Sequence, residues 1–205
     1  MKLDPNVSLE LTSLHQSHPW HRVDPTGGAG ELRVFIENTP ESAIKYEVDA
    51  ATGLLRVDHP LETSSLSPAA YGFVPRTLCG KNVAQLNSRL RGDQAALDVF
   101  VLSERPLLVA GVLADVHIIG GIPVKDESFV DDKLITVLHR DAVYGGMRDI
   151  SELPVYVLDR LCHFLAQESV ARHNEIGDAF GKSRADQLLS AGIKDYEQRF
   201  GDEFP

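Results

Sequence analysis

The chain has 205 residues, of which 43% are hydrophobic, so it is long enough to bury the core of one domain. Its formal net charge of −10 argues against a nucleic-acid partner, because polyphosphate backbones are bound by clustered Lys and Arg side chains. The apolar runs stop short of membrane-spanning length and no signal-peptide pattern opens the chain, so we expect no membrane partner and a cytoplasmic location. Cys79 and Cys162 have no metal or redox spacing, and we expect no disulfide.

Residues 1–30 are polar and irregular, with several prolines and glycines, and we expect them to form an arm that lies on the body of the protein. Within this arm, the sequence HPWH places His18 and His21 on either side of Trp20. Two histidines at this spacing could contribute to a zinc site, but zinc needs further ligands and none is nearby. The pattern therefore favours Trp20 as a plug that anchors the arm.

Three short segments with strand-like alternation follow, at residues 32–37, 44–49 and 53–58, and they predict a meander of three strands. In the second segment a period of two places Lys45 and Glu47 on one face. Glu37 ends the first segment and could face the same side. These charges form either a salt-bridge ladder on the surface or one wall of a pocket for an anion and a metal.

Two further strands are expected at residues 97–102 and 107–122, the second with bends or bulges at its glycines, as in barrel corners. Asp93 and Asp98 stand at the entry to the first of them. A carboxylate at the start of a buried strand is expensive unless it is paired or bound to a metal. The two are therefore either turn and capping aspartates or a pair of metal ligands.

The most acidic stretch is residues 125–133, KDESFVDDK, between two apolar runs. It crowds four carboxylates, those of Asp126, Glu127, Asp131 and Asp132, beside the ammonium group of Lys133. Like charges this close repel one another unless a cation lies among them, and carboxylate oxygens suit magnesium or calcium. The alternative is a solvated, charged hairpin tip.

Helical spacing of apolar residues predicts helices at residues 155–167 and 182–199, and both look structural. His163 in the first helix has apolar neighbours, so we expect it to pack in the core. Short strands followed by helices predict an α+β fold, a small closed barrel with helices packed outside it. We expect a single domain over residues 1–205, divided into the arm (1–30), the barrel (31–140) and the helices (150–200). No Gly-rich phosphate loop follows the first strand, which disfavours P-loop and Rossmann folds.

The order of motifs along the chain resembles that of soluble inorganic pyrophosphatases of family I. The motifs are IE, KYEVD, TGLLRVD, YGFVPRTL, GDxxxLDVxVL, GG, KDESFVDDK and RDISELP, over about residues 19–168. The chain is most similar to the variant of chlamydia-related bacteria that has an HPWH arm and a CG-containing insertion. The resemblance implies an OB-like five-stranded barrel, magnesium-dependent hydrolysis of diphosphate to two phosphates with Mn²⁺ as an alternative to Mg²⁺, and a homo-oligomer, often a hexamer.

The resemblance also implies three sets of site residues. The expected metal ligands are Asp93, Asp98, Asp126, Asp131, Glu47 and Glu37. The expected diphosphate-binding residues are Lys45, Lys133 and His59. The expected catalytic residues are Asp93, Tyr71 and Lys133. In such a site the metals clamp the diphosphate and activate the attacking water, while the lysines hold the phosphate oxygens.

Several positions depart from the family pattern. The motif Asp-Gly-Asp-Pro-x-Asp, read without gaps, becomes residues 93–98, so Ala95 stands where the family has a proposed general base. An alternative alignment with a two-residue insertion makes Asp93 that base and loses a metal ligand. The other replacements are His59 for a phosphate-binding arginine, Ser67 for a tyrosine, and Glu168 and Ser169 for a Tyr-Lys pair.

Two functions follow from these matches and departures. The first is a working magnesium-dependent diphosphatase, slowed or retuned by the replaced residues. The second is a catalytically impaired relative that binds a metal or an anionic ligand without efficient turnover. A third class, a barrel that binds single-stranded nucleic acid, needs a basic groove that this acidic chain does not show.

Overall fold

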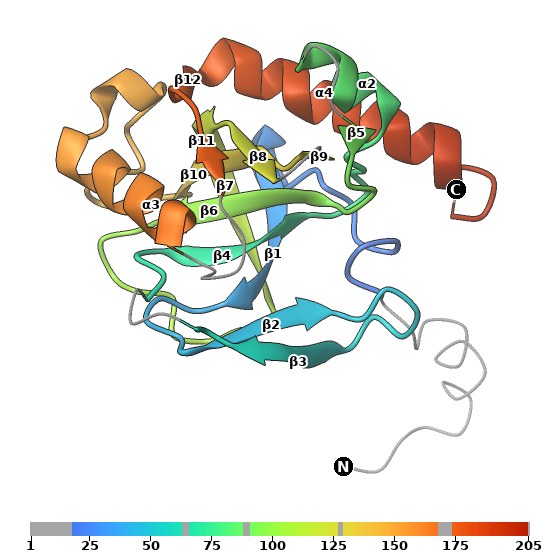
Figure 1. Cartoon of the computed structure of the whole chain (residues 1–205), viewed down its shortest axis with the longest axis horizontal. Helices are drawn as coiled ribbons and strands as arrows, with labels where there is room; N and C mark the ends of the chain where they lie inside the picture. The colour runs from blue at the N-terminus through green and yellow to red at the C-terminus, as the bar shows by residue number, and fades with distance from the viewer. Residues whose placement is uncertain (1–17, 63–65, 88–90, 127–128, 168–173, 205) are drawn as a thin grey trace.

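A closed β-barrel forms the centre of the protein in the computed structural model, which describes residues 18–62, 66–87, 91–126, 129–167 and 174–204 (Figure 1). Five strands form the barrel in the order β1 (Leu32–Asn38), β4 (Ala70–Val74), β6 (Leu97–Leu102), β10 (Lys133–Leu138) and β7 (Val112–Ile122). The barrel closes because β7 also pairs with β1. Neighbouring strands are antiparallel, except that β6 and β10 are parallel. The predicted α+β fold with an OB-like barrel is therefore confirmed.

The longest strand, β7, bends where the sequence predicts a barrel corner. Its ladder with β10 shifts register at Ile118 and Gly120, so one residue of β7 is left over as a bulge. A Cβ atom on Gly120 would lie 2.4 Å from the carbonyl oxygen of Phe180, and one on Gly121 would lie 2.4 Å from the Phe180 ring. Glycine at both positions lets the short strand β12 (Phe180–Gly181) pair with β7.

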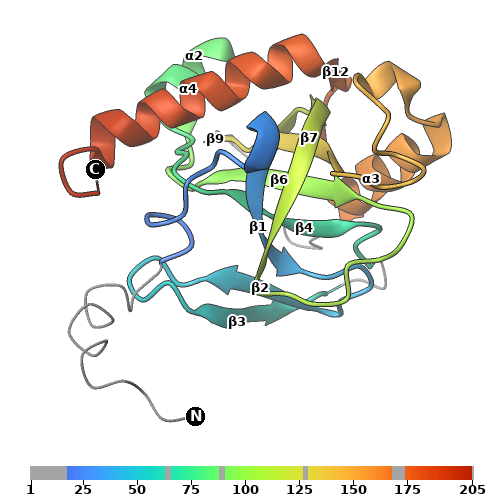
Figure 2. The ribbon, with the colours of Figure 1, turned by 180° about the vertical axis from the view of Figure 1, so that it is seen from behind.

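A separate hairpin of β2 (Ile44–Val48) and β3 (Leu55–Pro60) lies on the side of the barrel away from the longest helix (Figures 1 and 2). The predicted three-strand meander is wrong, because β1 does not belong to this ladder. Both edges of β1 are already paired, with β4 and β7, so no edge remains for β2. The side chain of Asn38 makes the link instead, bonding the backbone N–H and C=O of Tyr46 at 2.8 Å each.

The helices α2 (Lys81–Leu86), α3 (Val155–Gln167) and α4 (Lys182–Phe200) pack outside the barrel, with short 3-10 turns η1 (Gly28–Gly30) and η2 (Ile150–Glu152). In α3 the buried face carries Leu161, Phe164 and Leu165, and Phe164 meets Phe100 of the barrel edge to face. The expectation that His163 packs in the core is wrong, because its ring is exposed. Position 163 lies about 200° around the helix from Leu161, on the solvent side.

The acidic stretch is part of a second small sheet with the order β11 (Glu175–Ile176), β8 (Val124–Asp126), β9 (Phe129–Val130) and β5 (Arg91–Gly92). Val130, Asp132 and Lys133 are all buried, with at most 6% exposure. The interpretation as a solvated hairpin tip therefore does not hold for these residues, whereas Glu127, Ser128 and the side chain of Asp126 lie outside the described part of the chain.

The described part of the arm, from His18 onward, is held by Trp20, whose indole Nε1–H donates to the carbonyl oxygen of Thr77 at 2.8 Å. His21 stacks on Phe204 and lies 2.8 Å from the hydroxyl of Tyr196. These contacts confirm Trp20 as an anchor. Both cysteines are free thiols, as expected. Over the ranges that the structure describes, no helix has the length and apolar character of a membrane span.

Candidate active site

An open cleft of about 950 Å³ lies between the barrel and the β2–β3 hairpin. Among the described residues, eight acidic side chains and three basic ones line it. It gathers every predicted site residue whose side chain is described: Glu37, Lys45, Glu47, His59, Tyr71, Asp93, Asp98, Asp131 and Lys133. The side chain of Asp126 and the residues Glu127, Glu168 and Ser169 lie outside the described part of the chain. Residues that are far apart in the sequence thus share one acidic cavity.

Parallel pairing of β6 and β10 brings Asp98 beside Lys133. Leu134 is opposite Val99, so the residues that precede them, Lys133 and Asp98, are neighbours on adjacent strands. The Lys133 ammonium nitrogen lies 2.5 Å from a carboxylate oxygen of Asp98 and 2.5 Å from one of Asp131. Its side chain is only 5% exposed. Buried Lys133 therefore neutralises part of a half-buried cluster of negative charge.

Pairing of β5 with β9 brings Asp93 to the same place. Gly92 is opposite Val130, so Asp93 follows directly beside Asp131. A Cβ atom on Gly92 would lie 2.0 Å from the carbonyl oxygen of Cys79, which explains why glycine is needed at this close approach. Asp93 accepts a hydrogen bond from the backbone N–H of Ala95 at 3.0 Å, across a turn in which Gln94 has φ 68°.

The opposite wall of the cleft comes from β1 and the hairpin. Glu37 is 7% exposed, and its Oε1 accepts a hydrogen bond from the backbone N–H of Val48 at 2.7 Å. Lys45 and Glu47 both line the cleft, as their shared face predicts. Glu47 pairs with Arg56, the residue opposite it on β3.

The site shifts the pKa values of its carboxyl groups upward. Burial, together with the charges of Asp98 and Asp93 and against the opposing charge of Lys133, raises the pKa of Asp131 to about 7. Burial likewise raises the pKa of Glu37 to about 8. The pKa of Asp93 is raised by desolvation and by the charge of Asp98. These carboxylates are held close together at a cost that a cation among them would offset.

The donor set fits a hard divalent metal, because the acidic side chains that line the cleft among the described residues offer carboxylate oxygens. Such oxygen donors suit magnesium, calcium or manganese. Burial and the neighbouring acids raise the pKa of the Cys79 thiol far above its usual range, so it stays protonated and does not compete as a ligand.

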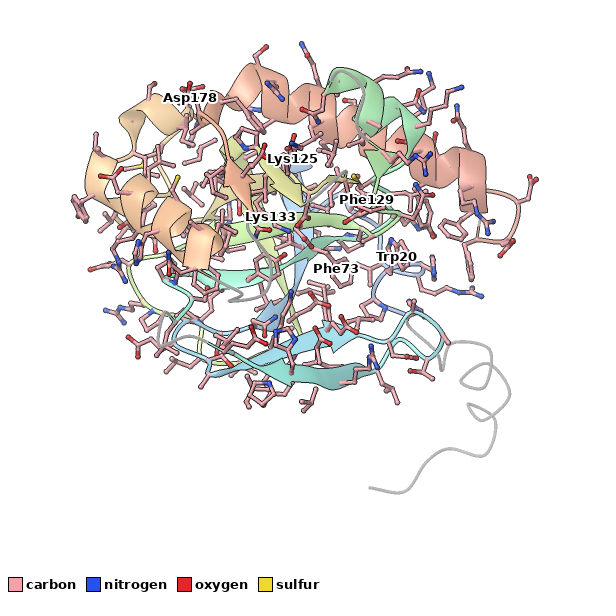
Figure 3. All side chains as sticks on the ribbon, in the orientation of Figure 1. Trp20, Phe73, Lys125, Phe129, Lys133 and Asp178 are labelled. Atoms are coloured by element: carbon pink, nitrogen blue, oxygen red, sulfur yellow. The ribbon has the colours of Figure 1, made fainter. Side chains whose placement is uncertain are left out.

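Sequence reasoning missed several residues of the cleft. Arg56 could have been found, because strand alternation in a paired hairpin places it opposite Glu47. The aromatic side chains of Trp20, Phe73 and Phe129 also line the cleft and lie to one side of Lys133 (Figure 3). No signal in the sequence groups these three, since each comes from a different part of the chain.

Two neighbours of the site direct their polar side chains to other partners. Asp132 points away from Asp131 and accepts hydrogen bonds from Asn87 at 3.0 Å and from the backbone of Val124 at 3.3 Å. Ser67 is buried and donates to the carbonyl oxygen of Ala69, which directs its hydroxyl to the backbone.

A closed barrel whose cleft joins clustered carboxylates to buried lysine is typical of a metal-dependent hydrolase that acts on phosphate compounds. The family model described as "Inorganic pyrophosphatase" matches residues 34–197, and the chain belongs to this family. It is 36% identical to the inorganic pyrophosphatase of Chlamydia caviae over 93% of this chain and 96% of that one. It is 35% identical to soluble inorganic pyrophosphatase 1 of Arabidopsis thaliana, over 78% of this chain and 70% of that one.

Solved structures agree with the sequence relatives. The pyrophosphatase of Thermus thermophilus superposes with a TM-score of 0.76 at 26% identity, over 87% of this chain and 99% of that one. The pyrophosphatase of Helicobacter pylori superposes with a TM-score of 0.71 at 30% identity, over 89% of this chain and 98% of that one. The chain is an inorganic diphosphatase, which hydrolyses diphosphate to two phosphates, and its family is metal-dependent.

Proposed function

We propose that this chain hydrolyses diphosphate with magnesium ions bound in the acidic cleft. The expected ligands are Asp93, Asp98, Asp126, Asp131, Glu47 and Glu37. The observation that supports the proposal most directly is the charge of the cleft, where eight acidic side chains face three basic ones among the described residues. A polyanionic substrate is repelled by such a surface unless divalent cations lie between them. Manganese fits the same oxygen donors.

When bound, the magnesium ions would lower the pKa of water and neutralise charge on the departing phosphate. The side chains of the chain then have to orient the substrate. Lys133 and Lys45 are the groups that would hold phosphate oxygens. To do so, the ammonium nitrogen of Lys133 must turn away from the two carboxylates between which it now lies. The centroid of the Tyr71 ring lies 5.7 Å from the Lys133 nitrogen, and we assign Tyr71 to orienting the attacking water.

The side chains of strand β3 in the hairpin contribute less to the binding of phosphate. His59 lies opposite Lys45 and bonds Asp58 at 3.0 Å, so its ring is directed toward an acid. Arg56, whose guanidinium also lines the cleft, is paired with Glu47. The proposal therefore assigns His59 a secondary contact with diphosphate and leaves most of the binding to Lys45, Lys133 and the metals.

The turn at Gln94 supports the alignment without gaps. In that alignment Gln94 stands at the glycine of Asp-Gly-Asp-Pro-x-Asp, and glycine is the residue that adopts positive φ without steric cost. Gln94 has φ 68°, whereas Gly92, the glycine of the alternative alignment, is not in the positive-φ region. Asp93 is then a metal ligand, and Ala95 stands in place of the proposed general base. Loss of a general base typically lowers a rate by ~10² to 10⁴.

Phosphate release from diphosphate, with and without magnesium, tests the assignment. We expect Asp131→Asn to lower the rate by about 10² to 10³, the usual effect of removing one charge-stabilising group. The matched control is Asp132→Asn, a neighbouring carboxylate that bonds Asn87 outside the cleft. Equal losses in the two variants would contradict the site, and no magnesium-dependent turnover above the uncatalysed rate would contradict the function.

Restoring the missing acid is a second test. Ala95 is exposed and lines the cleft, so an aspartate at this position has room to reach the attacking water. We expect Ala95→Asp to raise the rate, up to the ~10² to 10⁴ that a general base supplies. The control is Ala96→Asp, which adds the same charge to the next residue of the turn. A rise in the control alone, or in neither variant, would favour the gapped alignment.

The remaining features of the proposal concern the whole chain. We propose one domain over residues 1–205, acting in the cytoplasm as a homo-oligomer. Large apolar side chains exposed on the surface support assembly, such as Leu108 (74%), Val155 (72%) and Tyr156 (65%). Light scattering coupled to size-exclusion chromatography would give the subunit count, and a monomer at physiological concentration would contradict the assembly.

A further inference from the structure

A second cluster of ligand-type side chains lies at the far end of the barrel from the cleft. It consists of Glu31, just before β1, His117 in β7 and His139, just after β10. Glu31 is six residues from Glu37 along β1, and His139 is six residues from Lys133 along β10. At about 3.3 Å per residue, each separation is about 20 Å. The cluster is thus distinct from the acidic cleft, at the end of β1 away from the hairpin (Figure 2).

Strand register brings the three side chains to one face. Val116 of β7 pairs with Leu32 of β1 and also with Leu138 of β10. Glu31 directly precedes Leu32 of β1, and His139 directly follows Leu138 of β10. Because side chains alternate between faces, both lie on the face opposite to Val116, and so does His117.

The ligand atoms have the spacing of a metal site. Nδ1 of His139 lies 3.1 Å from Oε1 of Glu31 and 3.2 Å from Nε2 of His117. All three ligand atoms lie within 4.8 Å of one another. Two tetrahedral zinc ligands, each about 2.0 to 2.1 Å from the metal, are about 3.3 Å apart. We propose that Glu31, His117 and His139 bind one divalent transition-metal ion, zinc by preference, with a fourth position open to water.

The chemistry of the cluster favours zinc over magnesium. Imidazole nitrogens suit zinc and its neighbours in the first transition row, whereas magnesium selects oxygen donors. The Glu31 side chain is only 7% exposed, and a buried carboxylate is stabilised by a cation beside it.

Metal binding replaces the hydrogen bond between Nδ1 of His139 and Nε2 of His117 and also changes the contact of His139 with Arg140. Arg140 donates from Nε to Nε2 of His139 at 3.1 Å, and that nitrogen must carry a proton when Nδ1 binds the metal. Arg140 is exposed, so its side chain can turn toward solvent. Three strands that close the barrel would then share one ion, and binding to the folded state alone stabilises the fold.

Cobalt(II) is a suitable probe, because its visible spectrum reports nitrogen ligation. The chain is stripped with a chelator, supplied with excess magnesium to occupy the acidic cleft, and titrated with cobalt and then with zinc. We expect one cobalt per chain, displaced by zinc, and a higher melting temperature with zinc. His117→Asn and His139→Asn should each lower the affinity at least tenfold, since even indirect partners of metal ligands cost about 10-fold to 100-fold when removed.

Two controls separate this site from others. His163→Asn removes an exposed histidine on α3 and should leave cobalt binding intact. Asp131→Asn changes the cleft and should also leave it intact. Unchanged cobalt affinity in His117→Asn, or loss of cobalt binding in Asp131→Asn, would overturn the proposal. If His117→Asn does not fold, ring-proton resonances of the unmodified chain decide: zinc must shift those of His117 and His139 and leave those of His163, and any other pattern overturns the site.

Discussion

The buried carboxyl group of Glu37 makes the stability of the metal-free protein depend on pH. Burial, together with the charges of Asp98 and Glu47, raises the pKa of Glu37 from 4.5 to about 8. Between these two pH values the folded state keeps a proton that the unfolded chain has released. Because the folded state binds more protons, its stability falls as the pH rises through this window.

The size of the effect follows from the two pKa values. At 1.4 kcal/mol per pH unit, the protein loses about 4 kcal/mol of unfolding free energy by pH 8. A typical domain has a free energy of unfolding of roughly 5–15 kcal/mol, so this loss is a large part of it. Glu37→Gln has no proton to lose and keeps an oxygen that can accept the Val48 N–H. The variant should therefore be free of this part of the pH dependence.

Urea unfolding in the presence of a chelator, at about pH 5 and about pH 8, measures the prediction. The unmodified chain should lose about 4 kcal/mol more than Glu37→Gln between the two conditions. Magnesium added at the higher pH should restore stability to the unmodified chain. The control is Glu175→Gln, a carboxylate with a side chain 73% exposed, which should keep the full pH dependence. Equal pH dependence in Glu37→Gln and the unmodified chain would refute the reasoning.

Two further predictions concern the packing around the barrel. Buried Asp195 on α4 caps α2, because it accepts hydrogen bonds from the backbone of Gly80, Asn82 and Val83. Asp195→Ala should therefore lower the unfolding free energy, measured in urea titrations, by about 3 kcal/mol. Burial lowers the pKa of His21 to about 4, so stability should also fall as the pH drops from about 6.5 toward 4. Thermal melts of His21→Gln should show a smaller loss over that range.

The positions of most strands and both long helices could be predicted, because each has a local period. The shared face of Lys45 and Glu47 needs only the alternation of one strand, and both residues line the cleft. The place of β1 could not be predicted in this way. Its sequence fits a meander equally well, and only closure of the barrel by β7 occupies the edge that β2 would need.

The site shows the same division between local and long-range information. Resemblance to a family predicted which carboxylates meet in the cleft, but the reason that Asp93 lies beside Asp131 is the pairing of β5 with β9, two strands of two residues each. Strands this short leave no periodic signal in the sequence. The cluster of Glu31, His117 and His139 depends on the register of three strands at once, so neither spacing nor composition could have revealed it.

The charge of the cleft links its metal affinity to its substrate affinity. Lys133 is engaged by Asp98 and Asp131 in the metal-free protein, and Arg56 is engaged by Glu47, so these two cations of the cleft are already paired with acids. Metal ions that bind the carboxylates would release Lys133 toward phosphate, and an anionic substrate would in turn hold the metals more tightly. Such coupling is reciprocal by thermodynamic necessity. In the proposed site, a histidine at position 59 in place of the arginine that the family resemblance implies would therefore shift the binding of diphosphate from side chains toward metal ions.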